Sequence, residues 1–150
     1  MTSTPATAFT FGIRVPGSVA GVRSRVDAAL RAQGFGVITE IDVQATLRTK
    51  LGIERAPYLI LGACNPLLAN RAIEADPSIG ALLPCNVVLR EEDGATIVEA
   101  LNPMAALGIV GGAAVRAVAE EATARLERAI ATIGAHPRIG VEQGSESSIS

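Results

Sequence analysis

Two cysteines, each followed by an asparagine, are the residues of this 150-residue chain whose types and spacing best suit chemistry. They form the pairs Cys64-Asn65 and Cys85-Asn86, and a proline adjoins each pair. A thiolate is a nucleophile and a metal ligand, and an asparagine amide both donates and accepts hydrogen bonds. The four residues are therefore candidates for one ligand-binding site, although they would also suit the ends of two strands.

Cys64 is the candidate for a catalytic nucleophile. It comes directly before an Asn-Pro sequence that is typical of a helix start, where free backbone amides and the helix dipole favour a thiolate over a thiol. The alternative is a small, inert side chain at the buried end of a strand, because free cysteine is among the residues most often buried. The sequence leaves both interpretations open.

Whether the two cysteines meet depends on the direction of their strands. Cys64 closes one predicted strand and Cys85 opens another, so antiparallel neighbours would bring them to the same end of the sheet. Parallel neighbours would separate them by about 20 Å, the length of a six-residue strand. The helical segment between them favours a crossover and hence the parallel arrangement. We therefore predict no direct contact between Cys64 and Cys85.

Two carboxylates and one histidine are the remaining candidates. Glu40 and Asp42 are two residues apart at the end of a predicted strand, so both side chains leave on one face and can act in acid-base chemistry or hold a divalent cation. Asp42 is also placed to cap the next helix. His136 is the single histidine, and with neither a second histidine nor a CxxC pattern we expect no metal site within one subunit.

Composition argues against nucleic acid and membranes as partners. Aromatic residues make up 3% of the chain and the formal net charge is -2, so base stacking and attraction to phosphates are both weak. The start of the chain lacks the pattern of a secretory signal, and no run of 18 uncharged apolar residues occurs. The signatures GxGxxG, GxxxxGK[ST] and GxSxG, which are typical of dinucleotide sites, nucleotide-triphosphate sites and hydrolases, are missing. We expect a cytoplasmic protein with reduced cysteines.

Strands and helices alternate along the chain and would position these residues. Apolar patterning predicts strands at 9–15, 35–41, 58–63, 85–91 and 95–101. Helical spacing predicts helices after each of the first three strands, a short helical turn from Asn102-Pro103, and a long helix after Gly111-Gly112.

The resulting order is β-α-β-α-β-α-β-β-α, a two-layer α/β (α+β) fold with helices packed against a mixed sheet. The polar composition of both ends predicts one globular domain over residues 9–140, between loose tails at 1–8 and 141–150.

The chain resembles a bacterial and archaeal family named domain of unknown function 302. The resemblance lies in residues 34–52, 57–89 and 101–111 and in the closing helix at 118–130, and it extends over roughly residues 9–134. The paired Cys-Asn segments are its most specific feature. It implies a small α/β domain that forms a homodimer, and it implies no reaction, because the family is named for that absence.

These observations predict a cytoplasmic, non-catalytic domain that forms a homodimer and binds a small ligand or partner near the turn at Cys64. The ligand contacts are assigned to Cys64, Asn65, Cys85, Asn86 and Glu40, with no metal and with the cofactor unknown. The alternative function is a thiol-dependent enzyme or redox sensor in which Cys64 is the nucleophile and Asn86 orients the reacting group. A third interpretation is a structural interaction module with inert cysteines.

Overall fold

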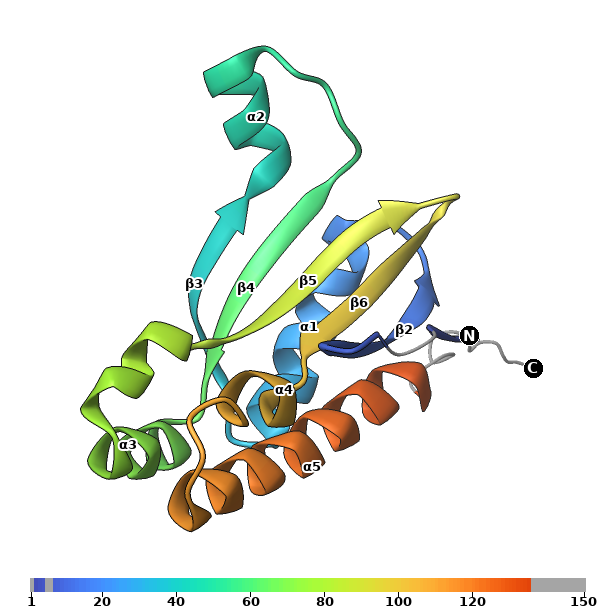
Figure 1. Ribbon diagram of the computed structural model, residues 1–150. Helices are drawn as coiled ribbons and strands as arrows, with labels where there is room; N and C mark the ends of the chain where they lie inside the picture. Colours follow the sequence, from blue (N-terminus) through green and yellow to red (C-terminus); the bar gives the residue numbers. More distant parts are fainter. Residues whose placement is uncertain (1, 5–6, 136–150) are drawn as a thin grey trace, which may run out of the picture.

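A six-stranded antiparallel sheet carries the helices (Figure 1). The computed structural model describes residues 2–4 and 7–135. Its strands are β1 (Thr2–Thr4), β2 (Thr10–Pro16), β3 (Gly36–Asp42), β4 (Tyr58–Cys64), β5 (Cys85–Glu92) and β6 (Ala95–Leu101). Its helices are α1 (Val19–Ala32), α2 (Val43–Leu51), α3 (Pro66–Ala75), the 3-10 helix η1 (Pro77–Leu82), α4 (Pro103–Leu107) and α5 (Ala113–Ala135). The strands pair in the order β1-β2-β6-β5-β4-β3.

The predicted α/β class and the predicted order of elements are confirmed. The structure adds η1 after α3. It also adds β1, which lies in the segment predicted as an N-terminal tail and pairs with β2. The predicted tail at 141–150 lies outside the described residues. The predicted hairpin is confirmed as well, because β5 and β6 pair through a turn at Asp93 and Gly94, which both have positive φ.

Helices α1 and α5 cover one face of the sheet and form the main core with it. Their buried side chains recur at helical spacing, as the apolar stripes of the sequence predict. Fully buried members of this core include Val22, Val26, Leu126, Ile133, Leu61, Leu89 and Val98. Burying each such side chain contributes about 1.5–3 kcal/mol. Within residues 2–4 and 7–135, no helix combines the length and the apolar character needed to cross a bilayer.

Three helices begin directly after a strand, and a residue at each junction caps the helix. Asp42 accepts a hydrogen bond from the backbone of α2, Asn65 from that of α3, and Asn102 from that of α4. A capping side chain satisfies an amide that has no partner within the helix. The chain therefore turns from β4 into α3 at the Cys64-Asn65 pair, which fixes where Cys64 lies.

The direction of β5 corrects the prediction for the two cysteines. β4 and β5 are antiparallel neighbours, with Ala63 opposite Cys85, so Cys64 and Cys85 lie at the same end of the sheet. The predicted parallel arrangement is wrong. The connection is not a crossover, because α3 ends at Ala75 and η1 packs back against it, which returns the chain to the end of the sheet that it left.

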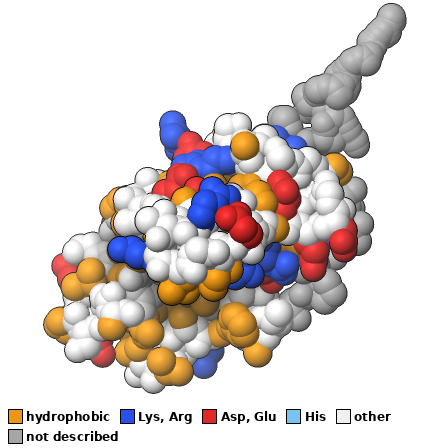
Figure 2. All heavy atoms as spheres, turned by 90° about the horizontal axis from the view of Figure 1, so that it is seen from above, with side chains coloured by type: hydrophobic (Ala, Val, Ile, Leu, Met, Phe, Trp, Pro, Cys, Tyr) orange, Lys and Arg blue, Asp and Glu red, His pale blue; other side chains and the backbone are white. Residues whose placement is uncertain are grey.

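Helix α2 stands apart from the other helices, at the far end of the β3–β4 pair (Figure 1). None of its residues is buried. Figure 2 looks down on this end of the molecule and shows blue basic, red acidic and orange hydrophobic side chains close together. α2 therefore presents a mixed surface, much of it uncovered.

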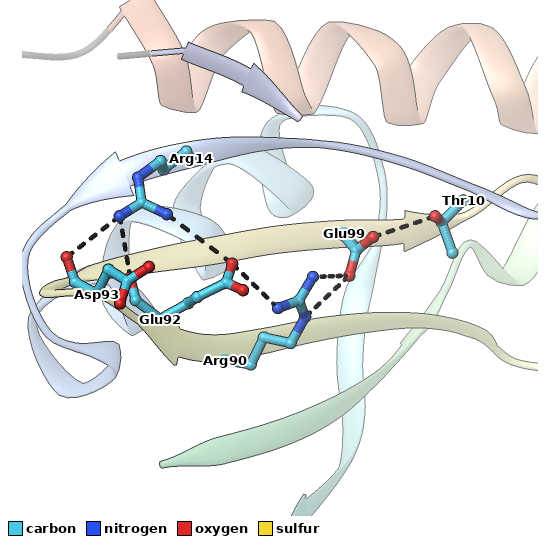
Figure 3. A network of polar contacts seen from close by, with 6 residues as sticks. All are labelled: Thr10, Arg14, Arg90, Glu92, Asp93 and Glu99. Atoms are coloured by element: carbon cyan, nitrogen blue, oxygen red, sulfur yellow. Dashed lines mark hydrogen bonds and ion pairs between the residues drawn. The ribbon is translucent and has the colours of Figure 1, made fainter. Parts of the chain in front are cut away.

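The sheet face opposite α1 and α5 carries a network of charged side chains (Figure 3). Arg90 lies 3.1 Å from Glu99 and 3.5 Å from Glu92, and the hydroxyl of Thr10 donates to Glu99. Arg14 donates to the backbone oxygens of Glu92 and Asp93. These contacts join β2, β5 and β6 and hold the tip of the hairpin against β2.

Candidate functional site

A cavity of about 270 Å³ lies beside the two cysteines. It is bounded by the ends of β4 and β5, by α3 and η1, and by the first half of α5. Its wall is almost wholly hydrophobic and includes Phe35, Leu68, Ala72, Leu83, Leu107 and Val118. Cys64, Asn65 and Cys85 complete this wall, and among the described residues no charged side chain lines it.

The cavity occupies the seam between two hydrophobic clusters. The main core contributes Phe35 and Ala63 to the wall, and a second cluster under α3, η1 and α4 contributes Leu68, Ala72 and Val118. Several residues of the wall are small: Ala63, Ala69, Ala72, Gly80 and Ala122. Because these side chains are small, they do not fill the space between the two clusters, and a cavity remains.

The mouth of the cavity has a hydrophobic rim. Ile38 and Ile73 line the cavity although their exposed fractions are 62% and 42%. Ile38 lies where the β3–β4 register shifts between Val37 and Thr39. A bulge of this kind turns a side chain away from the regular alternation of the strand. Exposed apolar side chains gathered at an opening are typical of a surface that contacts an apolar ligand or partner.

Burial suppresses ionisation of one of the two cysteines. Both are free thiols with half-buried side chains. Burial, with a smaller contribution from the neighbouring Cys64, raises the pKa of the Cys85 thiol to about 11. Cys85 therefore stays a neutral thiol at pH 7 and adds to the apolar wall.

Asn65 joins helix capping to the cavity wall. Its Oδ1 accepts a hydrogen bond from the backbone of Leu68 at 3.1 Å, as the sequence predicts for a cap. Its amide packs closely on Gly34, where a Cβ would lie 2.9 Å from Asn65 Nδ2 and where φ is +84°. Because the cap uses the amide oxygen, the amide nitrogen is the group that Asn65 can offer to a ligand.

Comparison with known proteins identifies the family. A family model described as "Domain of unknown function DUF302" matches residues 11–133. The chain belongs to the DUF302 family. Among solved structures, it is similar to the uncharacterized conserved protein DUF302 from Bacillus stearothermophilus, with 26% sequence identity and a TM-score of 0.78. That similarity covers 85% of this chain and 99% of the other. No curated protein matches the chain.

The DUF302 fold brings together three of the five residues assigned to ligand binding. Cys64, Asn65 and Cys85 share the cavity wall. Asn86 is exposed and pairs with Gly62 across the β4–β5 ladder, outside the residues that line the cavity. Glu40 lies in another hollow, at the opposite end of β4, where it forms an ion pair with Arg23 at 2.8 Å. The candidate site is therefore smaller than the predicted set.

The other candidates have structural roles or lie outside the described chain. Asp42 caps α2 through its contact with the backbone of Ala45. Within residues 2–4 and 7–135, no group of three His, Cys, Asp or Glu side chains is placed to hold a metal ion. His136 lies outside the described residues.

Most of the cavity wall of this DUF302 domain was missed by reasoning from the sequence. Leu68 and Ala72 are four residues apart on the buried face of α3, which is a visible helical signal. Phe35, Leu107 and Val118 come from three other parts of the chain, and nothing in their local patterns indicates that they meet. Only the packing of α3 and α4 on α5 brings them together.

Proposed function

We propose that this DUF302 domain binds a small apolar molecule in the cavity beside Cys64 and Cys85. The observation that carries the proposal is an almost wholly hydrophobic wall around about 270 Å³. Packed protein interiors leave few voids larger than a water molecule. An engineered apolar cavity of about 150 Å³ in another protein takes up benzene. The larger space here suits an occupant of one or two small rings, or a short branched chain.

The wall also defines the polarity of the ligand. Within residues 7–135 no charged side chain lines the cavity, and Cys85 is held as a neutral thiol. A charged group buried there would lose its hydration with no partner to replace it. The ligand should therefore be uncharged where it is buried, with at most one polar group directed to the amide of Asn65 at the wall.

The proposal assigns binding rather than catalysis to this site. A catalytic cysteine needs a neighbouring base or another group that stabilises its thiolate. The part of the cavity wall that the structure describes offers no histidine or carboxylate for that purpose. The proposal includes a cytoplasmic location, because two free cysteines suit a compartment that keeps thiols reduced.

Fluorescence of the apolar probe N-phenyl-1-naphthylamine tests the binding proposal. The probe should bind the wild-type protein with increased emission. Ala69→Phe places a large ring at a half-buried position of the wall and should weaken probe binding at least tenfold. Ala75→Phe is the matched control, because Ala75 is exposed on the same helix and does not line the cavity. Equal binding by all three folded proteins would overturn the proposal.

A second copy of this chain is the partner that we propose for the surface of α2. Ile41, Leu51 and Ile53 are exposed there, and Leu51 has an exposed fraction of 65%. The same region carries Lys50, Arg55 and Arg48, the last of which forms an ion pair with Glu54, whereas the tip of the β5–β6 hairpin carries Glu91, Glu92 and Asp93. A twofold axis can bring the basic side chains of this mixed surface in each copy to the acidic tip of the other, so the pairing is self-complementary.

Sedimentation at micromolar protein tests this partner. The wild type should sediment as a dimer, and Leu51→Asp should shift it to the monomer without changing its circular dichroism. Thr49→Asp is the matched control, since Thr49 is also exposed on α2 but adds no apolar surface. A wild-type protein that stays monomeric would refute the dimer, whatever the variants do.

A further inference from the structure

We propose that Cys64 and Cys85 form a reversible intramolecular disulfide that links β4 to β5 in the wall of the cavity and so regulates its occupancy. The effect on occupancy rests on the proposed ligand-binding function. The bond itself does not, because it can be measured with the cavity empty.

The strand register brings the two cysteines within bonding range. Ala63 lies opposite Cys85, and Cys64 is the next residue of β4. In an antiparallel pair, a spacing of about 4.8 Å between strands and a rise of about 3.4 Å per residue place such diagonal neighbours roughly 6 Å apart at their Cα atoms. Disulfides join Cα atoms that are about 4.4–6.8 Å apart. The backbone separation therefore suits a disulfide.

The end of β4 also allows the side chains to turn toward each other. In a regular strand, adjacent positions face opposite sides of the sheet, which would direct Cys64 away from Cys85. However, β4 ends at Cys64, where Asn65 leaves the strand to cap α3. The residue before β5 is Pro84, which has no backbone N–H and therefore cannot donate a hydrogen bond to Cys64. Both cysteines already line the same cavity.

The two thiols have different environments, and the difference assigns their roles. Burial and the neighbouring Cys64 raise the pKa of Cys85, so Cys85 remains protonated at neutral pH. Cys64 is the last residue of β4, directly before the cap of α3, and we assign it as the sulfur that reacts first with an oxidant, with Cys85 as the resolving thiol. A pair made of one attacking and one resolving cysteine is the common arrangement of redox-sensitive dithiols.

A hydroperoxide is the oxidant class that we assign. The Cys64 thiol loses its proton to solvent and its sulfur attacks the peroxide; a sulfur–oxygen bond forms, the oxygen–oxygen bond breaks, and the departing oxygen takes up a proton and leaves as water or an alcohol. The Cys85 sulfur then loses its proton and attacks the Cys64 sulfur; the disulfide forms and the sulfur–oxygen bond breaks, releasing water. Two thiols thus give up two electrons, which reduce the peroxide. A dithiol reductant reverses the change.

The bond would alter the cavity because both sulfurs belong to its wall. Drawing Cys64 toward Cys85 moves the end of β4, and with it Asn65 and the first turn of α3. Leu68 and Ala69, which line the cavity, lie in and after that first turn. Oxidation should therefore change the shape of the wall opposite Val118 and weaken the binding of a ligand that fits the reduced form.

Peptide mapping of the full chain after treatment with hydrogen peroxide tests the bond. Trypsin cleaves after Arg55, Arg71 and Arg90, so the two cysteines fall in separate peptides, 56–71 and 72–90. In the wild type we expect these peptides to be joined, two hydrogen atoms lighter than their sum, and to separate on reduction. Mixing ¹⁵N-labelled with unlabelled protein before oxidation should yield linked peptides of matching label only.

Two serine variants test the assigned roles. Cys85→Ser should leave a sulfenic acid on Cys64 that dimedone captures, whereas Cys64→Ser should show at least tenfold less dimedone adduct. Over-oxidation of Cys64 with no linked peptide in the wild type would overturn the proposal, and so would links between labelled and unlabelled chains. Equal dimedone capture in both variants would overturn the order of attack.

The probe assay separates this proposal from the proposed ligand-binding function. We expect peroxide to weaken N-phenyl-1-naphthylamine binding to the wild type at least fivefold, and a dithiol to restore it, with no change in Cys85→Ser. A disulfide that forms but leaves probe binding unchanged would overturn the regulation alone. If the reduced protein fails to bind the probe while the disulfide still forms, the ligand-binding function fails and the redox pair stands.

Discussion

Arg71 of α3 lies 3.2 Å from Glu121 of α5, and this ion pair joins two helices that enclose the cavity. Glu121 also accepts a hydrogen bond from Arg125 at 3.1 Å, and Arg125 in turn donates to the backbone oxygen of Gln33 at the end of α1. A short polar chain on the surface therefore links α3, α5 and α1. It holds the helical side of the cavity in place, while the hydrophobic seam beneath it leaves space.

The first prediction concerns the response of this link to acid. The hydrogen bonds from Arg71 and Arg125 lower the pKa of Glu121 below its usual value of 4.5. Because the folded-state pKa is the lower one, the stabilisation is present above the unfolded-state pKa and is lost as pH falls through the folded-state value. Glu121→Gln should therefore lower the urea midpoint at neutral pH and flatten its fall in acid.

Glu120→Gln provides the control for this measurement. Glu120 lies on the same helix and is 3.9 Å from Arg116, a longer and exposed contact. Such surface pairs contribute little. The control should follow the wild-type profile from about pH 7 to about pH 3, and addition of salt should reduce the difference between Glu121→Gln and the wild type. A Glu121→Gln profile parallel to that of the wild type would contradict the prediction.

The second prediction concerns the ionisation of Cys85. Its pKa of about 11, against a usual value of 9.0, means that the folded protein holds this proton more tightly than the unfolded chain does. The associated stabilisation is complete below about pH 9 and is lost as pH rises toward about 11. A shift of this size corresponds to about 3 kcal/mol. Iodoacetamide should label Cys85 slowly at pH 8 and much faster above pH 10.

Comparison of Cys64→Ser with the wild type isolates the contribution of the neighbouring thiol. Burial is the larger cause of the raised pKa and remains in this variant, so Cys85 should still label slowly at pH 8. The charge of Cys64 is the smaller cause, and its removal should move the midpoint of the labelling profile to lower pH. A midpoint near 9 in the folded wild type would show that Cys85 is neither buried nor coupled.

Local signals in the sequence account for most of the fold. Asn65-Pro66 predicts the start of α3, and Asp93-Gly94 predicts the hairpin turn; both are confirmed because a cap or a turn depends on neighbouring residues alone. The direction of β5 depends instead on a tertiary contact. Leu68 of α3 and Ile79 of η1 are buried in one cluster, and this packing folds the connection back. No local pattern distinguishes that return from a crossover.

The candidate site was predicted only where it coincides with those local signals. Cys64 and Asn65 lie at the turn from β4 into α3, and the sequence predicts both this turn and the position of the two residues at it. Asn86 was assigned with them because it repeats the Cys-Asn pair, yet a one-residue step along a strand moves a side chain to the other face. The cavity itself is the space that small side chains leave between two hydrophobic clusters, and no pattern in the sequence predicts such a space.

The third prediction concerns the cap that fixes Cys64. Asn65→Ala removes the acceptor for the backbone N–H of Leu68 and should lower the free energy of unfolding by about 1 kcal/mol. Asn65→Asp keeps an acceptor at the same position and should retain most of that stability. Urea denaturation checks both values. Loss of stability in both variants alike would show that the amide nitrogen beside Gly34, rather than the cap, is the stabilising group.

The fourth prediction concerns the close approach of strands at Gly62. A Cβ at this position would meet Thr39 Oγ1 and would lie 2.9 Å from Pro84 Cγ, so Gly62→Ala forces the neighbouring side chains of β3 and the chain before β5 to move. Overpacking of this kind typically costs about 1–3 kcal/mol. Gly36→Ala is the matched control on the neighbouring strand, because a Cβ there would meet nothing within 4 Å.

A double-mutant cycle with Thr39 identifies the source of that cost. Thr39→Ala removes the hydroxyl that the new methyl group would meet, so the double variant should be more stable than the sum of the two single changes predicts. Because Pro84 adjoins Cys85 and lines the cavity, Gly62→Ala should also weaken probe binding, and Thr39→Ala should restore part of it. If the losses in the free energy of unfolding are additive, the contact of the new methyl group with Pro84 alone accounts for the destabilisation. Pro84, before β5, would then be the residue that limits the space at this part of the cavity.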